Sequence, residues 1–396
     1  MKIFREELFG GVLFDTGNLR YELASKRMVG NVEKFLPINY QPPRSDILSS
    51  PIRVYFEITR KCNLHCKHCF ASSTNNEDDL LSKNEIYTIL EQMREFRILD
   101  IRFTGGEPTC REDWFDLLKY SKDLGFAVSI NTNGVYKNQK EILRKLLLLD
   151  LNQITISIDG LEKNHDFIRG KNSFKSAIRS LISFSNAGLP LRVNTVISKR
   201  NYQEIPLLLD LVAPYIKEIN FFYMRPIGRA LNLVDSSLSF EEHLDSAQKT
   251  LSLNDNYKTL RIMHFEQSYR ERSISKALAK SLELQPSLPY GGSTLAISFD
   301  GKVWPHGYSP YQDDCFEVGD LKKSSLPKIW YESNRLEKFR YWMAELMTIC
   351  NNCFYYQENQ CAGINFEMEI ARQNGEIVQN PFCKANVTFP RYKMRG

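Results

Sequence analysis

The sequence lacks any long hydrophobic run. No stretch of about 18 apolar residues occurs, although a membrane-spanning helix requires roughly that length. The first eleven residues, MKIFREELFGG, also lack the apolar stretch of a secretory signal. Neither membrane insertion nor export is therefore indicated, and we expect a cytoplasmic protein.

Blocks of basic residues are missing as well. The formal net charge of +5 is modest, and it is spread along the chain without the Lys/Arg blocks of nucleic-acid-binding arms. We therefore expect no nucleic-acid partner. At most, the charge favours an acidic partner such as a peptide.

Internal repeats and low-complexity tracts are absent, and the composition is that of a folded protein. With 396 residues, 42% of them hydrophobic and 25% charged, the chain is long enough for more than one domain. We expect an N-terminal hairpin and extension over residues 1–50, a barrel with a helical linker over 51–285, and a C-terminal domain over 286–396. In the first stretch, strand-like residues 11–14 and 20–23 flank a turn at Asp15-Thr16-Gly17-Asn18, which predicts a β-hairpin.

From residue 52 to about 230, short β-rich runs alternate with amphipathic stretches. The candidate strands are Arg53–Thr59, Ile101–Thr104, Ala127–Asn131, Gln153–Ile158, Arg192–Ile197 and Glu218–Tyr223. Ser82 and Glu85 form a capping box before a helix whose apolar residues, Ile86, Ile89, Leu90 and Met93, repeat at helical spacing. Repeated βα units predict an α/β fold with a parallel sheet. Six units are too few to close an eight-stranded barrel, so we expect a partial, open (β/α)6 barrel.

The chain after the predicted barrel changes character. Residues 231–285 have a helical pattern, and a hairpin is predicted over residues 295–304, where Asp300-Gly301 provides the turn. A helix is expected near Leu326–Met347, followed by a tail rich in cysteine. We place the boundary between the second and third stretches near residue 285.

Nine cysteines in a long chain do not resemble a small secreted disulfide scaffold. Three of them, Cys62, Cys66 and Cys69, occupy one loop directly after the first predicted barrel strand, at the end of the barrel where ligands bind. Three thiols can each ligate one iron of a [4Fe–4S] cube and leave the fourth iron open. A structural zinc site is the alternative, with His65 or His68 as the fourth ligand.

The Cys-x3-Cys-x2-Cys spacing, followed by the aromatic Phe70, resembles the signature of the radical S-adenosylmethionine (AdoMet, or SAM) superfamily. The resemblance implies that the open iron binds AdoMet and that one electron releases a 5′-deoxyadenosyl radical. It also implies an electron donor and places Phe70 near the adenine.

The next predicted strand ends in Thr104-Gly105-Gly106-Glu107-Pro108. Glycines at a strand end let the backbone approach a ligand closely, and a carbonyl or carboxylate that follows them can accept a hydrogen bond from an ammonium group. By resemblance to the family, Gly105, Gly106 and Glu107 contact the methionine amino group of AdoMet.

Small polar residues also follow the later strands. The resemblance implies that Asn131, Ser157 and Asn194 contact the ribose or the carboxylate of AdoMet. The guanidinium groups of Arg169 and Arg225 could bind a carboxylate, although single arginines are as often surface or packing residues.

Four further cysteines, Cys350, Cys353, Cys361 and Cys383, lie in the last fifty residues. Four thiolates complete either an iron–sulfur cluster or a zinc site without a vacancy. The preceding hairpin and Gly319-Asp320-Leu321 resemble the SPASM domain of radical AdoMet peptide maturases, which holds two auxiliary clusters. Three ligand positions of the inner cluster here carry Tyr290, His306 and Asn365, so we expect one auxiliary [4Fe–4S] cluster.

Three residues remain as candidates for chemistry. Cys110 follows the GGEP motif, and Cys315 aligns loosely with a ligand of the family, but an inert or free thiol is the commoner interpretation of each. His306 is a candidate surrogate ligand or substrate contact, or a hydrogen-bonded histidine of the hairpin.

The resemblance predicts a radical SAM enzyme that removes a hydrogen atom from a ribosomally made precursor peptide. Cross-linking and backbone C–C cleavage are favoured over epimerisation, for which Cys110 or Cys315 could donate the hydrogen atom. The first 50 residues are too few for a complete winged-helix leader-binding domain, which favours a separate recognition protein or direct capture of the peptide. A porphyrin or another small molecule is the alternative substrate, and a non-catalytic zinc-binding module is a remote one.

Overall fold

The computed structural model describes residues 1–24, 32–42, 47–225, 227–253, 256–264, 289–307 and 316–354, with single residues 373, 383 and 385. Its centre is a ten-stranded sheet in the order β11-β10-β9-β8-β7-β6-β5-β12-β13-β14. Six parallel strands form the middle of this sheet: β5 (Arg53–Thr59), β6 (Asp100–Gly105), β7 (Ala127–Thr132), β8 (Gln153–Ser157), β9 (Leu191–Ile197) and β10 (Glu218–Tyr223). The predicted partial (β/α)6 barrel is therefore confirmed.

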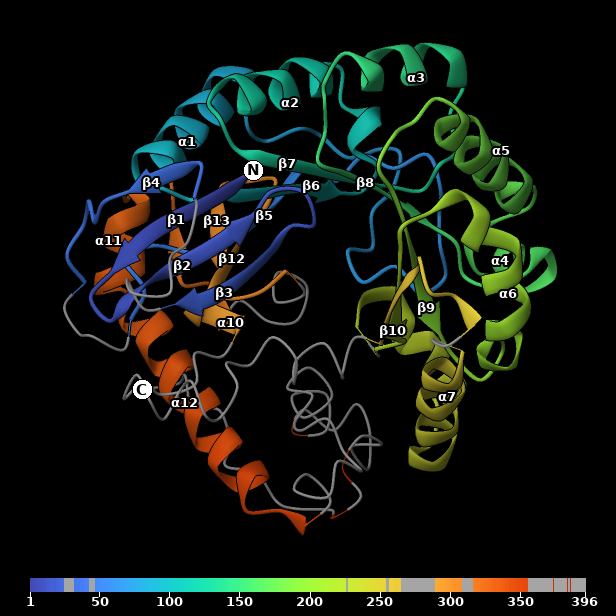
Figure 1. The fold of residues 1–396 in the computed structure, drawn as a ribbon. Helices are drawn as coiled ribbons and strands as arrows, with labels where there is room; N and C mark the ends of the chain where they lie inside the picture. Colours follow the sequence, from blue (N-terminus) through green and yellow to red (C-terminus); the bar gives the residue numbers. More distant parts are fainter. Residues whose placement is uncertain are drawn as a thin grey trace.

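Helices surround the outside of this sheet as an arc (Figure 1). They are α1 (Lys83–Glu95), α2 (Trp114–Asp123), α3 (Gln139–Leu147), α4 (Glu162–Arg169), α5 (Ser173–Asn186) and α6 (Ile205–Val212). The capping box predicted for α1 is present, because Glu85 N–H donates to Ser82 Oγ and Ser82 N–H donates to the Glu85 carboxylate. All four apolar residues predicted for its inner face are buried. The alternate strand residues that face these helices, such as Val54, Phe56 and Ile101, are fully buried in the same core.

The sheet extends beyond the six predicted strands on both sides. β11 (Arg261–His264) pairs in parallel with β10, after the 3-10 helix η5 (Gly228–Ser236) and α7 (Phe240–Ser252). The wholly helical pattern predicted for 231–285 is thus wrong at β11. On the other side, β12 (Thr294–Ile297) pairs in parallel with β5.

The C-terminal part continues the central sheet. β12 and β13 (Lys302–Trp304) form the predicted antiparallel hairpin, and β14 (Gly319–Asp320) pairs with β13. The short helix α10 (Pro289–Gly292) precedes the hairpin. The single helix predicted near residues 326–347 is two helices, α11 (Leu326–Glu332) and α12 (Asn334–Asn351). The break lies at Ser333, whose hydroxyl accepts the Leu336 N–H and caps α12.

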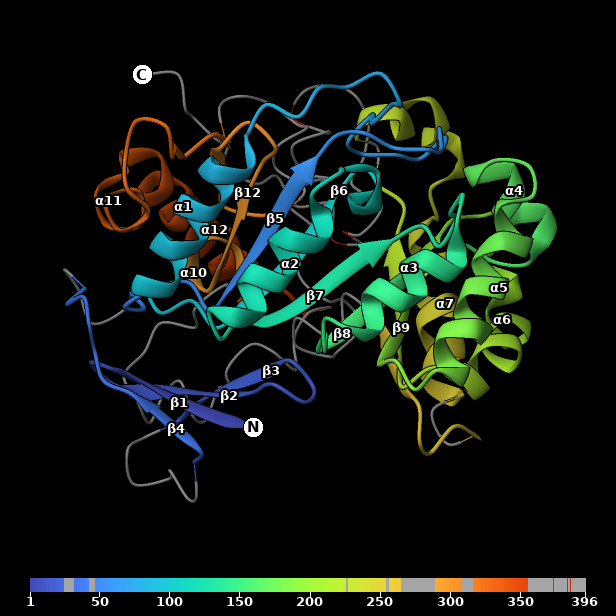
Figure 2. The same cartoon turned by 90° about the horizontal axis from the view of Figure 1, so that it is seen from above.

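A separate four-stranded sheet, with the order β3-β2-β1-β4, lies beneath the barrel (Figure 2). It comprises β1 (Lys2–Glu7), β2 (Gly10–Asp15), β3 (Arg20–Ala24) and β4 (Lys34–Leu36), and β2 and β3 form the predicted hairpin. Its turn contacts the beginnings of the barrel strands, because Arg53 donates to the Leu19 carbonyl at 2.7 Å and Asn152 donates to the Thr16 carbonyl at 3.1 Å. The hairpin therefore covers the base of the barrel.

None of the helices among the described residues is both long and apolar enough to cross a membrane.

Candidate functional site

The three cysteines of the first cluster lie in the loop after β5, at the carboxyl end of the barrel. Cys66 is buried, whereas Cys62 and Cys69 are partly exposed, and all three line one cavity of about 240 Å³. Among the described residues, no three His, Cys, Asp or Glu side chains converge as ligands of a single metal ion. In a [4Fe–4S] cube, each cysteine thiolate ligates a different iron.

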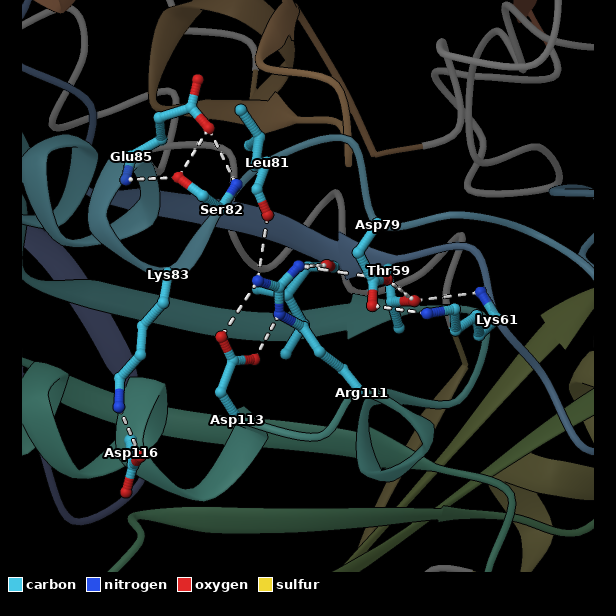
Figure 3. Close-up of polar contacts among 11 residues, drawn as sticks. Thr59, Lys61, Asp79, Leu81, Ser82, Lys83, Glu85, Arg111, Asp113 and Asp116 are labelled. Atoms are coloured by element: carbon cyan, nitrogen blue, oxygen red, sulfur yellow. Dashed lines mark hydrogen bonds and ion pairs between the residues drawn. The ribbon is translucent and has the colours of Figure 1, made fainter.

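The beginning of the cysteine loop is fixed by charged side chains beneath it (Figure 3). Asp79 accepts a hydrogen bond from Thr59 Oγ1 at 2.5 Å and pairs with Lys61 Nζ at 2.9 Å. Arg111 donates to the carbonyls of Ile58 and Leu81, at 3.0 Å each, while Asp113 holds its guanidinium. The end of β5 and the segment before α1 are therefore tied together.

Gly105 and Gly106 pack directly against the same loop. The N–H of Gly106 donates to the Thr59 carbonyl at 2.9 Å. A Cβ on Gly105, whose φ is +131°, would lie 2.1 Å from that carbonyl oxygen, and one on Gly106 would lie 2.2 Å from the Lys61 carbonyl oxygen. The Gly-Gly pair is thus required by the contact of two backbone segments beside the cavity.

Gly106→Ala is expected to displace the cysteine loop, because the added methyl group has backbone atoms on its contact side. We expect a stability loss of about 1–3 kcal/mol, as overpacking typically costs, together with a lower iron content after reconstitution. Urea denaturation and iron analysis measure the two effects. Gly17→Ala is the control, because Gly17 lies in an exposed turn where the nearest atom to a Cβ is a side-chain oxygen at 3.2 Å. Equal losses in the two variants would contradict the prediction.

A buried carboxylate, Asp159, fixes the other side of the cysteine loop. One of its oxygens lies 2.7 Å from His68 Nε2 and 2.6 Å from Arg169 Nε, and the other accepts the Val196 N–H at 2.8 Å. Burial alone would raise the pKa of Asp159, but Arg169 and His68 hold it below its ordinary value. Asp159 therefore stays ionised and links α4 and β9 to the cysteine loop.

Arg229, in η5, forms hydrogen bonds with the backbone of the cysteine loop. Its Nε donates to the Cys66 carbonyl at 2.8 Å, and its backbone N–H donates to the Cys69 carbonyl at 3.0 Å. The loop is therefore held by backbone contacts with several elements, and its thiols remain available to line the cavity.

Comparisons with known proteins agree with this geometry. The family model described as the radical SAM superfamily matches residues 56–212, and the model of the SPASM iron–sulfur cluster-binding domain matches residues 289–354. An Fe-coproporphyrin III synthase of Methanosarcina barkeri is 30% identical over 348 residues, which cover 82% of each chain. The chain belongs to the radical SAM superfamily.

Two further comparisons concern the sequence and the fold of this radical SAM enzyme. The mycofactocin maturase MftC of Mycolicibacterium smegmatis is 32% identical over 190 residues, 48% of each chain. The crystal structure of Streptococcus suis SuiB bound to S-adenosylmethionine has a TM-score of 0.70 at 16% identity, over 95% of this chain and 96% of SuiB. The similarity to MftC extends over about half of each sequence. The similarity to SuiB shows a shared fold.

Membership of the superfamily brings an AdoMet-binding [4Fe–4S] cluster, and the SPASM domain binds auxiliary iron–sulfur clusters. The cavity fits a polar cofactor such as AdoMet. Within the described part of the chain, Oδ1 of Asn131 and Oδ1 of Asn194 are buried without a hydrogen-bond partner, and both residues line the cavity. Buried acceptors require donors, which the hydroxyl and amino groups of AdoMet supply.

Burial affects the acidity of two of the three thiols. Burial raises the pKa of Cys62 to about 12, and burial raises the pKa of Cys66 as well, although Arg169 opposes the latter shift. Such thiols stay protonated until a positive centre replaces the proton.

Most of the predicted site residues line this cavity: Phe70, Gly105, Gly106, Asn131, Ser157, Arg169, Asn194 and His306. Their individual roles remain predictions. His306 is buried, and burial followed by the charge of Arg225 keeps its pKa well below the ordinary value. Because His306 comes from the segment after β13, the C-terminal part forms one wall of the cavity.

Glu107 lies behind the cavity wall instead of within it. Its carboxylate accepts hydrogen bonds from Thr109 Oγ1 at 2.7 Å, Thr132 Oγ1 at 2.9 Å and Asn133 N–H at 2.7 Å. In the described structure, the side chain of Glu107 thus joins the ends of β6 and β7. Its predicted contact with the AdoMet amino group stays a prediction.

Cys110 and Arg225 are not among the described residues that line the cavity. Burial raises the pKa of the Cys110 thiol to about 11, and the charge of Glu107 adds to the shift. Arg225 is buried, and its positive charge lowers the pKa of His306.

The second group of cysteines is partly described. Cys350 is buried near the end of α12, Cys353 follows one turn later and donates its N–H to the Cys350 carbonyl at 2.9 Å, and Cys383 packs against the same small core as Cys350. Cys361, Cys315 and Asn365 lie outside the described residues. The predicted four-thiolate cluster therefore remains a prediction.

Sequence reasoning missed Asp159, Arg229 and the inward-facing arginines of the barrel. Asp159 lies in the Ser157-Ile158-Asp159-Gly160 stretch, but nothing local indicates that it contacts His68, which is 91 residues away. The alternation of polar and apolar residues within each strand was an available signal for the inward-facing groups.

Proposed function

We propose that this radical SAM enzyme modifies a ribosomally made precursor peptide by removing a hydrogen atom from it. The observation that carries the proposal is the common cavity, where the three cysteines, the strand-end polar residues and the C-terminal part meet. When bound, the cluster and AdoMet supply a 5′-deoxyadenosyl radical. In this proposal, Arg169 and Asn194 orient AdoMet, and His306 lies on the side of the cavity that the substrate contacts; all three line the cavity.

Two observations support a peptide as the substrate. The mycofactocin maturase is 32% identical over 190 residues, 48% of this chain. A SPASM domain follows the radical SAM domain, and an auxiliary cluster there offers an outlet for the electrons released by cross-linking or C–C cleavage. An external electron donor and a separate leader-recognition protein belong to this proposal.

A tetrapyrrole is the second candidate substrate. The Fe-coproporphyrin III synthase matches 82% of both chains, a wider span than that of the maturase. The cavity is compatible with either substrate, because both carry polar groups.

One assay distinguishes between a peptide and a tetrapyrrole as the substrate. Reconstituted enzyme, AdoMet and reductant are incubated either with the peptide encoded beside the gene or with iron tetrapyrroles, namely iron coproporphyrin III and its tetrapyrrole precursor, and both 5′-deoxyadenosine and the product mass are measured. We expect the peptide to stimulate 5′-deoxyadenosine formation and to lose two hydrogens on cross-linking or a larger mass on excision. An unchanged mass with deuterium uptake from D2O would indicate epimerisation. Stimulation by the tetrapyrrole alone would contradict the peptide proposal.

A further inference from the structure

The inside of the barrel is polar below the level of the cysteine loop. Closed (β/α)8 barrels are filled by branched apolar side chains, whereas this cavity is lined by polar inward-facing strand residues: Tyr55, Glu57, Arg102, Thr104, Asn131, Ser157, Arg192 and Asn194. Polar side chains are therefore available to bind a polar ligand deep inside the barrel, below the carboxyl ends of the strands.

Two arginines mark the floor of this lumen. Arg102, on β6, and Arg192, on β9, line both the upper cavity and a smaller one at the barrel base, where residues 18–21 of the N-terminal hairpin form the opposite wall. Arg102 lies two residues before Thr104, and so about 7 Å deeper along the strand. A substrate group bound at the floor of the cavity would belong to the part of the substrate that extends beneath the AdoMet site.

Positive charge exceeds negative charge at the floor. Asp100 forms an ion pair with Arg53, and Glu218 pairs with Arg261 at 2.9 Å and with Arg192 at 3.4 Å. Each of these two carboxylates is thus already engaged by an arginine other than Arg102.

Among the described residues, the guanidinium of Arg102 has only distant protein partners. Its side chain is 7% exposed, its nearest carboxylate oxygen, on Asp100, lies 3.6 Å away, and the ring of Tyr55 lies 5.8 Å away. Within the described chain, its Nε has no hydrogen-bond partner. Burial, followed by the charge of Arg53, lowers the pKa of Arg102 to about 9. A buried cation with incomplete pairing is costly, and an anionic ligand would offset that cost.

We propose that Arg102 binds a carboxylate of the substrate at the floor of the cavity. A guanidinium fork recognises a carboxylate through two parallel hydrogen bonds. The proposal rests on the proposed function, since it assumes that the substrate enters this cavity.

A carboxylate of this kind has two sources. It is an acidic side chain in a peptide or a propionate in a porphyrin. The peptide probe is N-acetyl-glutamate α-amide, with the glutamine analogue as its neutral counterpart. The tetrapyrrole probe is coproporphyrin III, with its tetramethyl ester as the neutral counterpart. Calorimetric titration into AdoMet-loaded holoenzyme gives the four affinities.

We expect at least one acid to bind wild-type enzyme about tenfold more tightly than its neutral counterpart, as a charge-assisted hydrogen bond predicts. In Arg102→Gln this preference should fall below about twofold, and Arg102→Lys, which keeps the charge, should retain part of it. A purely structural role for Arg102 would weaken acid and neutral probe alike. Arg179→Gln removes an exposed charge on α5 and should keep the full preference.

The proposal is overturned if neither acid is preferred by the wild-type enzyme, if no probe binds, or if the preference survives in Arg102→Gln. Formation of 5′-deoxyadenosine is measured on the same samples. If the wild-type enzyme prefers neither acid but forms 5′-deoxyadenosine normally, only the carboxylate site is rejected, whereas absence of 5′-deoxyadenosine from the wild-type enzyme rejects the proposed function. If Arg102→Gln does not fold, the wild-type comparison and Arg102→Lys decide the question.

Discussion

Replacing Cys62 with alanine is expected to abolish 5′-deoxyadenosine formation. The variant removes one of three thiols that line the cavity, and a cube that loses one of three protein ligands is not retained. Iron in the anaerobically reconstituted enzyme should fall from about eight to about four atoms per chain, counting four per cube. Anaerobic assay with dithionite and colorimetric iron analysis measure both results.

Cys350→Ala is the matched control for this prediction. Cys350 belongs to the C-terminal core and not to the wall of the cavity, so its replacement should also cost about four irons while 5′-deoxyadenosine formation without substrate continues. Product formation should stop, if the auxiliary cluster accepts electrons from the substrate. About twelve irons in the wild-type enzyme would refute the single auxiliary cluster. A Cys62→Ala variant that still cleaves AdoMet would refute the assignment of the first cluster.

The barrel was predictable from the sequence because each strand alternates between two faces. In Arg53–Thr59, the residues Val54, Phe56 and Ile58 are apolar and face the helices, and the same alternation recurs in the next strands. β11 escaped prediction because it is four residues long and follows a helix. Short edge strands take their structure from pairing with a neighbour, here β10.

Residues that line the cavity were easier to predict from the sequence than residues whose side chains hold other parts of the protein in place. The cysteine spacing and the glycine pair are local patterns, and both lie at the cavity. Glu107 belongs to the same local pattern, but its carboxylate contacts Thr132 and Asn133, more than 20 residues away. Such a contact follows from tertiary packing, which spacing along the chain does not encode.

Asp159→Asn is expected to weaken both the fold and the binding of AdoMet. The substitution removes the charge that pairs with Arg169 and His68, whose side chains are 10% and 8% exposed. Breaking a buried ion pair typically costs about 3–5 kcal/mol, since the remaining charge is left uncompensated. Because the pKa of Asp159 lies below its ordinary value, the carboxylate is ionised throughout the range from about pH 5.5 to 8, and the stability deficit should be present throughout that range.

Arg169 also loses the partner that fixes its position at the cavity. The KM for AdoMet should therefore rise by at least about tenfold, as the loss of a charged hydrogen bond predicts. Urea denaturation at several pH values and steady-state 5′-deoxyadenosine formation give the two readouts.

Asp166→Asn is the control, on helix α4, which also contains Arg169. Asp166 accepts the N–H groups of Asn172 and Phe174 at the start of α5 and does not contact the cysteine loop among the described residues. It should cost only about 1 kcal/mol, as the loss of a helix cap does, and should leave the KM for AdoMet unchanged. If both variants lost the same stability and kept the wild-type KM, Asp159 would be an ordinary buried carboxylate. A deficit confined to Asp159→Asn would instead show that AdoMet binding at the barrel rim depends on a residue that the cofactor does not need to touch.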